Sequence, residues 1–209
     1  MKKIVCILVL LLLCAGADAQ KRDDKAISSE ILAEFERMKA DFTENDNEWV
    51  FVKVFDAENQ SKDDIFTKAL EVLVSLYKDA KEVIQIKDKE SGLIVGKGFS
   101  DSDIRTINWT TICRNRCWHI IKIEIKDNKF RVTVTVSGVE REQDADLRHP
   151  FDGTEYTLRS FYPYWTECKT KFKQVSFDNL RYVYSSSLAL IKAVEDGVKK
   201  GLNNSSNEW

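Results

Sequence analysis

The sequence predicts an α+β fold, a two-layer domain in which an antiparallel sheet of hairpins carries helices on one face. Three observations predict it. Apolar residues recur at three- and four-residue spacing in three segments, they alternate with polar residues in the segments between, and short polar turns join the alternating runs. The expected order is helix, strand, helix, hairpin, hairpin, irregular insertion and terminal helix, which is typical of helices packed on one face of an antiparallel sheet.

The first 19 residues have the features of a secretory signal peptide. Two lysines precede an apolar run from Ile4 to Leu13, and Ala17-Asp18-Ala19 matches a cleavage pattern. The run is shorter than the roughly 20 residues that span a bilayer. Cys14 follows a leucine, whereas lipid-modified cysteines normally follow a small residue. We expect an exported chain, periplasmic or secreted, without a transmembrane segment in its mature form, and lipid anchoring is the less favoured alternative.

Length and charge limit the possible partners. The chain has 209 residues, enough for one sizeable domain, and 43% of them are hydrophobic. Cleavage after Ala19 would remove two lysines and one aspartate and so change the formal net charge from −2 to −3. Nucleic-acid-binding domains usually carry a marked basic stripe, so we expect no nucleic acid partner.

Three cysteines follow residue 19, namely Cys113, Cys117 and Cys168. In an oxidising compartment the simplest arrangement is one disulfide and one odd thiol, with Cys168 paired to Cys113 or Cys117. With His119 these residues would also match a Cys3His zinc set by ligand type, although C-x3-C spacing alone is weak evidence. We expect the disulfide and no metal.

Residues 20–47 are expected to form an amphipathic helix and a linker. The helix is predicted by apolar residues at helical spacing, which are Ile27, Ile31, Phe35, Met38 and Phe42, and the polar run TENDNE follows it. The next segment, residues 49–56, reads as a strand that alternates valines with Trp49, Phe51 and Phe55. Because both of its faces carry apolar residues, we expect each face to be covered.

Residues 61–80 predict a second amphipathic helix. Ser61 is the candidate N-cap, and Asp63 and Asp64 lie in the first turn, where negative charge complements the helix dipole. The broad apolar stripe from Ile65 to Tyr77 is expected to face the core.

Residues 82–99 predict a hairpin rather than a phosphate-binding loop. Only three aliphatic residues separate Gly92 from Gly96, and Gly98 stands where the phosphate loop requires Ser or Thr. Residues 119–138 predict a second hairpin around an Asp-Asn-Lys turn, with apolar side chains on one face and polar ones on the other. One side should pack and the other should meet water.

The last third of the chain divides into an insertion and a helix. Residues 140–176 lose the periodicity and are expected to form loops with one or two strands. Residues 177–209 are expected to contain a long terminal helix that packs on the domain, with Asp178 or Ser176 as its cap and Gly201 as its end.

Two stretches together resemble a known family, VFVKVFDAENQSKDDIFTKALEVLVSLYKDAKEVIQIKDKESGLIVGKGF and IKIEIKDNKFRVTVT. The matching features include the Ser61-Lys62-Asp63 helix start, the Asp88 to Gly92 turn, the Gly96-Lys97-Gly98 strand and the Asp127-Asn128-Lys129 turn. The family is a secreted bacterial domain of unknown function with a TATA-box-binding-protein-like (TBP-like) fold. The resemblance covers residues 48–139 and implies that fold and a Gram-negative envelope location, but no activity and no DNA binding.

Few residues suggest catalysis. Of the two histidines, His119 shares a face with Ile121 and is expected in the core, whereas His149 lies in a polar loop. The nucleophile pattern G-x-S-x-G and the zinc pattern H-E-x-x-H do not occur. We expect no enzymatic activity and no cofactor.

The aromatic run FYPYW is the candidate binding site. Clustered aromatic side chains on a loop can form a ligand or partner platform, and the run provides Phe161, Tyr162, Tyr164 and Trp165. The alternative is that this loop folds back and covers the second apolar face of the Trp49 strand.

These observations predict an exported cell-envelope protein that acts as a non-catalytic binding or interaction module, with an unknown envelope protein or a small ligand as its partner. The alternative is a small-ligand-binding or enzymatic domain of the helix-grip type, because such domains share much of this element order. A cavity of several hundred Å³ lined by aromatic residues would favour that alternative. A filled core with a flat polar sheet face would favour the interaction module.

Overall fold

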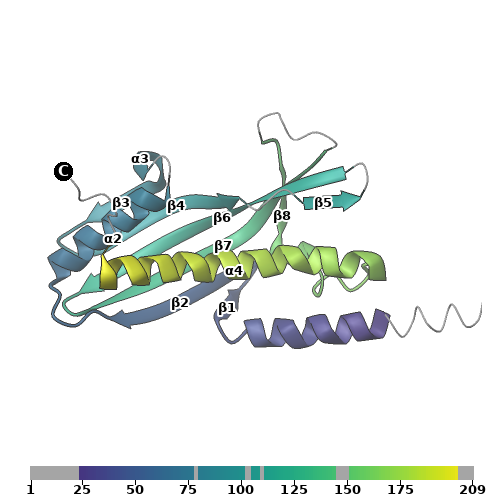
Figure 1. Ribbon diagram of the computed structural model, residues 1–209, viewed down its shortest axis with the longest axis horizontal. Helices are drawn as coiled ribbons and strands as arrows, with labels where there is room; N and C mark the ends of the chain where they lie inside the picture. The colour runs from purple at the N-terminus through teal and green to yellow at the C-terminus, as the bar shows by residue number, and fades with distance from the viewer. Residues whose placement is uncertain (1–23, 78–79, 102–104, 109–110, 145–150, 202–209) are drawn as a thin grey trace, which may run out of the picture.

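An antiparallel sheet forms the framework of the protein. The computed structural model describes residues 24–77, 80–101, 105–108, 111–144 and 151–201 (Figure 1). In that part of the chain the sheet has the strand order β1-β2-β7-β6-β4-β3, while β5 pairs with β6 and β8 pairs with β7. The strands are β1 (Phe42–Asn45), β2 (Glu48–Asp56), β3 (Ile84–Asp88), β4 (Leu93–Asp101), β5 (Arg105–Asn108), β6 (Thr111–Lys126), β7 (Lys129–Asp144) and β8 (Thr154–Thr157).

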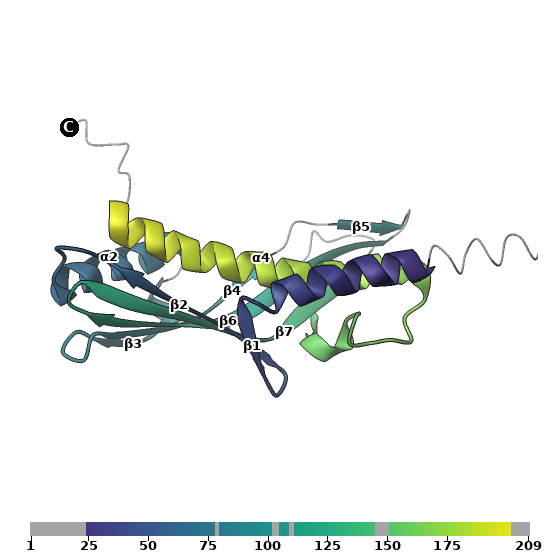
Figure 2. The ribbon, with the colours of Figure 1, turned by 90° about the horizontal axis from the view of Figure 1, so that it is seen from below.

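Among the described residues, the long helices all lie on one face of this sheet, as Figure 2 shows. They are an N-terminal helix over residues 24–38, α2 (Lys62–Leu76) and α4 (Thr170–Lys200). The short helix α3 (Ala80–Val83) precedes β3, and a single 3-10 turn, η1 (Leu158–Ser160), follows β8. The predicted α+β class with helices on one face of an antiparallel sheet is therefore confirmed.

The space between the sheet and the helices is filled by one hydrophobic core. The largest fully buried side chains include Trp49 and Phe51 from β2, Phe130 from β7 and Phe177 from α4. The N-terminal helix contributes Ile31, Phe35 and Met38 to the same core. Each Å² of apolar surface removed from water contributes about 25 cal/mol to the free energy of folding. This layer is therefore the main source of stability.

The start of α2 follows the sequence pattern. The Ser61 hydroxyl accepts a hydrogen bond from the Asp64 backbone N–H at 3.2 Å, and the Asp64 carboxylate accepts from the Ser61 backbone, so the two residues form a capping box. The predicted N-cap is confirmed. Residues Ile65, Phe66, Ala69, Val72 and Leu73 are buried on the core face of the helix, as the apolar stripe predicted.

The stretch SGLIVGKGF forms the turn and second strand of a hairpin, as predicted, and not a phosphate loop. Gly92 has φ +70°, and a Cβ at this position would lie 2.4 Å from the Ile125 carbonyl oxygen. The turn therefore needs glycine both for its backbone conformation and for the close approach to β6.

Three element boundaries differ from the prediction. The N-terminal helix ends at residue 38, and Phe42 belongs to β1, which pairs with β2 through a turn where Asp46 has φ 54°. The hairpin of β6 and β7 extends well beyond residues 119–138, to Thr111 and Asp144. Helix α4 begins at Thr170, after Lys169, so neither Ser176 nor Asp178 is its cap, whereas Gly201 does end it.

The expectation that both faces of β2 are covered is wrong. Trp49 and Phe51 face the helices and are buried, but Val52 and Val54 point to the helix-free face and are exposed. The helix-free face of the sheet is therefore open, and we call it the open face.

Candidate functional site

The open face is built from residues that alternate with the core residues along each strand. Its side chains come into line across the sheet through the antiparallel register: Leu93 of β4 pairs with Glu124 of β6, which pairs with Arg131 of β7, which pairs with Val54 of β2. The next row is Val95, Lys122, Thr133 and Val52. The hairpin prediction, one packed side and one solvent side, is confirmed by these rows.

Apolar side chains remain exposed on this face. Val54 keeps 63% of its surface exposed, and its neighbour Val52 and the β6 residue Ile120 are also among the exposed large hydrophobic residues. Towards the far end of β4, Phe99 is exposed as well and meets Trp118 of β6 with ring centroids 5.0 Å apart. A group of exposed apolar residues on one sheet face marks a candidate interaction surface.

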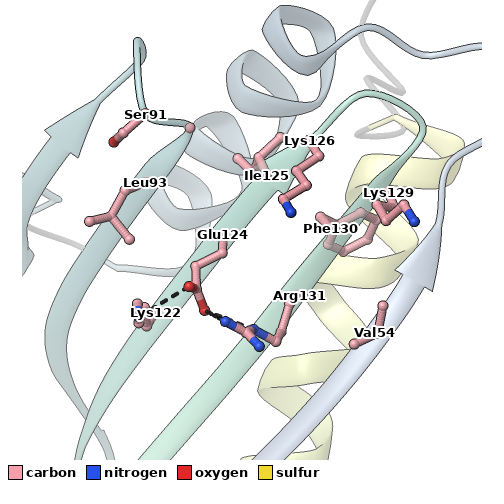
Figure 3. A pocket seen from close by; sticks show the side chains of 11 residues that line it. Val54, Ser91, Leu93, Lys122, Glu124, Ile125, Lys126, Lys129, Phe130 and Arg131 are labelled. Atoms are coloured by element: carbon pink, nitrogen blue, oxygen red, sulfur yellow. Dashed lines mark hydrogen bonds and ion pairs between the residues drawn. The ribbon is translucent and has the colours of Figure 1, made fainter.

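A shallow depression of about 460 Å³ lies at one end of the open face (Figure 3). Its floor is formed by β4, β6, β7 and β2. The charged residues around it are four cations and a single carboxylate, namely Lys122, Lys126, Lys129, Arg131 and Glu124. The depression therefore has a net positive lining although the whole chain is slightly acidic.

Glu124 lies between two of these cations, as Figure 3 shows. Arg131 Nε donates to its carboxylate at 2.8 Å, and Lys122 Nζ lies 3.2 Å from the other carboxylate oxygen. Burial by itself would raise the pKa of Glu124, but the hydrogen bonds from Arg131 and Lys122 outweigh it and hold the pKa below its ordinary value. The carboxylate is therefore charged at neutral pH and fixes the orientation of both cations.

The aromatic run lies at the opposite end of the molecule from this depression, and its members have different environments. Phe161 and Tyr162 are buried in the core, and Trp165 keeps 49% of its surface exposed. Tyr164 accepts a hydrogen bond from Trp49 Nε1 at 3.1 Å and donates to the Glu44 carboxylate. The loop thus packs against the buried face of β2, not its valine face, and presents mainly Trp165 to solvent.

The cysteines are not joined in the described part of the chain. Cys113, Cys117 and Cys168 are all free and buried, so the expected disulfide is not formed in this structure. Cys113 and Cys117 are four residues apart on β6, about 13 Å in an extended strand, well beyond the roughly 7 Å limit for a bridge. Burial raises the pKa of Cys117 to about 12, so its thiol is not nucleophilic.

No group of three or more His, Cys, Asp or Glu side chains is placed to hold a metal ion among the residues that the structure describes. His119 is buried, as predicted, and its Nε2 lies 2.6 Å from the Tyr77 hydroxyl. His149 and the signal-peptide segment, with Cys14, lie outside the described residues. Over the described ranges, no helix is long and apolar enough to span a bilayer.

The open face was not identified as a site from the sequence. The sequence did contain a sign of it, because the three residues on one face of β2, Val50, Val52 and Val54, are all apolar. A strand with two apolar faces is usually covered on both sides, and the sequence does not show that the helices all lie on one side.

Part of the chain matches a known protein family. A family model described as a domain of unknown function (DUF4468) with TBP-like fold matches residues 51–137. The chain is similar to a DUF4468 family protein from Bacteroides ovatus, with TM-score 0.48 and 14% identity over 73% of this chain and 89% of that chain. It is also similar to a TBP-like protein from Parabacteroides distasonis, with TM-score 0.44 and 14% identity; the match covers 74% of this chain and 97% of that chain. The comparison with curated proteins found no match.

Proposed function

Since residues 51–137 match the family model of DUF4468 with a TBP-like fold, a domain without an assigned function, we propose that this protein is an exported cell-envelope module that binds a partner protein through its open face and performs no catalysis. The observation that carries the proposal is the open face itself. There, exposed valines and Ile120 adjoin a depression with a net positive lining.

The partner should present both apolar and acidic groups. Val52, Val54 and Ile120 leave apolar surface in water, and covering it would contribute about 25 cal/mol for each Å² removed from solvent. The cations Lys126, Lys129 and Arg131 around the depression favour carboxylates over basic groups. This combination of an apolar centre and a charged margin is common in protein interfaces.

Nucleic acid is a less suitable occupant. Glu124 holds a negative charge in the depression between Lys122 and Arg131, and the flanking valines and Ile120 offer phosphates no hydrogen bonds. Backbone phosphates are bound mainly by unpaired cations. The formal net charge of −2 also disfavours a polyanion.

The buried groups support a role without catalysis. His119 is enclosed by the fold, and burial lowers its pKa to about 4, so it is neutral but out of reach of a substrate. The Cys117 thiol is likewise buried and protonated. The histidine and the cysteines in the described part of the chain are thus not presented to solvent. Export rests on the N-terminal sequence pattern.

The test compares three full-length chains in the bacterium that encodes the protein. The first is the natural protein, the second carries Val54→Asp and Ile120→Asp on the open face, and the third carries Val74→Asp, an exposed valine on helix α2. Each chain is extracted from the envelope under native conditions and its assembly mass is measured.

The proposal predicts an assembly heavier than the monomer for the natural chain and for Val74→Asp, and a monomer for the open-face double variant. High salt should also weaken the assembly, because screening reduces the attraction between charged groups. An assembly that tolerates the double variant, or a natural chain that is monomeric in the envelope, would contradict the proposal.

A further inference from the structure

A second hollow lies on the helix side of the sheet, away from the open face. It has a volume of about 230 Å³ and lies between the end of β7, the segment that follows β8 and the first turns of α4. Its lining includes Arg141, Tyr156, Phe161, Trp165, Phe172 and Ser176. Pockets for drug-sized ligands typically measure 300–1,000 Å³, so this hollow is suited to a smaller molecule.

Arg141 gives the hollow its charge. The residue is half-buried, and its Nε is buried with no hydrogen-bond partner. Its Nη2 lies 3.9 Å from the Cys113 sulfur, a weak acceptor. Among the described residues no carboxylate forms an ion pair with this guanidinium.

A partly buried guanidinium without an acceptor is costly. Removing a charged donor from water is unfavourable unless hydrogen bonds replace the lost hydration. The planar guanidinium fork matches a carboxylate with two parallel hydrogen bonds. An incoming carboxylate would therefore supply a strong acceptor to a guanidinium whose only hydrogen-bond partner among the described residues is the Cys113 sulfur.

The other walls are aromatic. Tyr156, Trp165 and Phe172 are all among the exposed large hydrophobic residues, and together they surround this one hollow. Phe161 is buried beneath them, with its ring centroid 6.1 Å from that of Tyr156. Exposed aromatic rings around a concave site favour a ligand with an apolar or aromatic body.

Ser176 is one of three further polar residues that line the hollow, with Gln143 and Ser160. The Ser176 hydroxyl accepts a hydrogen bond from the Tyr162 backbone N–H at 2.8 Å. Its own proton remains available to donate, because a hydroxyl carries one donor and two acceptor sites. Arg141 and Ser176 thus provide donors on walls that are otherwise mainly apolar.

We propose that this hollow binds small carboxylates that carry an apolar body, through Arg141 and the aromatic walls formed by Tyr156, Trp165 and Phe172. The carboxylate could belong to a free organic acid or to the C-terminal residue of a peptide, since both present the same chemistry. The inference does not depend on the proposed function, because the hollow and the open face are on opposite sides of the sheet.

The test uses phenylacetate as the probe, with the cationic benzylamine and the neutral isostere phenylacetamide as comparisons. Binding to the full chain is followed by NMR through the Trp165 indole N–H, which reports on this wall. The proposal predicts saturable binding of phenylacetate and at least tenfold weaker binding of both comparison compounds. Equal binding of all three, or no saturation by phenylacetate at millimolar concentration, would overturn it.

Two variants locate the site. Arg141→Met keeps most of the apolar stem of the side chain but removes the charge, and should weaken phenylacetate binding at least tenfold. Arg37→Met makes the same change at an exposed position of the N-terminal helix, outside both the hollow and the open face, and should leave binding unchanged. If both variants bind phenylacetate as the natural chain does, Arg141 does not hold the carboxylate and the proposal fails.

The source of the carboxylate is distinguished by a second pair of probes. N-acetylphenylalanine carries the C-terminal carboxylate of a peptide, and its C-terminal amide lacks it. If the acid binds at least as tightly as phenylacetate and the amide does not bind, peptide C-termini are ligands of the hollow. If phenylacetate binds and N-acetylphenylalanine does not, the ligand is a small free acid.

Discussion

The Tyr77 hydroxyl lies 2.6 Å from Nε2 of His119 in the buried layer between α2 and β6. Burial lowers the pKa of His119 to about 4, an effect that a hydrogen bond to the Cys117 backbone only partly offsets. The imidazole is therefore neutral, and its Nε2 shares a hydrogen bond with the Tyr77 hydroxyl. Burial also raises the pKa of Tyr77, so the hydroxyl keeps its proton.

The pair predicts acid sensitivity. Below pH 6.5 the unfolded chain binds a proton at His119 that the folded chain does not bind until about pH 4. Folding stability should therefore fall as the pH decreases from 6.5 to 4, by about 3 kcal/mol for the full shift. Urea unfolding at several pH values measures it. The double variant Tyr77→Phe with His119→Leu removes both polar partners, so its free energy of unfolding should decrease less between pH 6.5 and pH 4. If the double variant loses as much stability as the natural chain, other groups cause the acid sensitivity.

Gly197 provides a prediction about the contact between α2 and α4. A Cβ at this position would lie 2.1 Å from a Val72 methyl carbon, so Gly197→Ala must push the helices apart. Overpacking typically costs 1–3 kcal/mol, whereas alanine in a helix gains only about 1 kcal/mol over glycine. We expect a net loss in the free energy of unfolding. Adding Val72→Ala should restore part of it, and a stabilised single variant would show that the helices are not in close contact.

The capping box of α2 predicts a local loss of stability. Ser61→Ala removes the acceptor for the Asp64 backbone N–H and should cost about 1 kcal/mol. Ser75→Ala, an exposed serine in the last turn of the same helix, is the matched control and should cost less than about 0.5 kcal/mol. Chemical denaturation of the two variants compares them directly. Equal effects would mean that the cap does not limit stability.

The cysteines predict a distinct pattern of reactivity. Because Cys113, Cys117 and Cys168 are free and buried, an alkylating reagent should modify none of them in the folded protein and all three in urea. Intact mass spectrometry counts the added groups without prior reduction. A chain two hydrogens lighter, with only one of these residues modified in urea, would instead establish the disulfide that the sequence favours.

The sequence identified those elements whose local pattern matches their environment. Helix α2 has a cap and a continuous apolar stripe, and the hairpin of β3 and β4 has a glycine turn, so both were predicted closely. In the hairpin of β6 and β7, the prediction ended where apolar alternation ended. Beyond that point, ion pairs between facing residues of the two strands, such as Arg114 with Glu142, stabilise the pairing. A search for alternating apolar residues does not detect such pairs.

Other features depend on contacts between distant segments. The first turns of α4 contain Lys173, which is buried and forms an ion pair with Asp24 of the N-terminal helix. The sequence around Lys169 does not indicate that α4 begins there, because the Lys169 side chain makes no capping hydrogen bond. The two candidate sites also depend on contacts between distant segments. The open face depends on which side of the sheet the helices occupy, and the Arg141 hollow is lined by residues of β7, β8 and α4. Spacing along one chain does not contain this information.

If the open face binds a partner, site-specific photo-crosslinking in the cell that produces the protein should capture that partner. A photoreactive amino acid replaces Val54 or Ile120 on the open face, or Val74 on α2 as the control, since all three positions are exposed. We expect one discrete crosslinked product from Val54 and Ile120 and none from Val74. The product from Val54 should be reduced when Arg131→Glu reverses the charge beside it. Crosslinks that form equally from Val74, or none from the open face while Val74 reacts, would contradict the account.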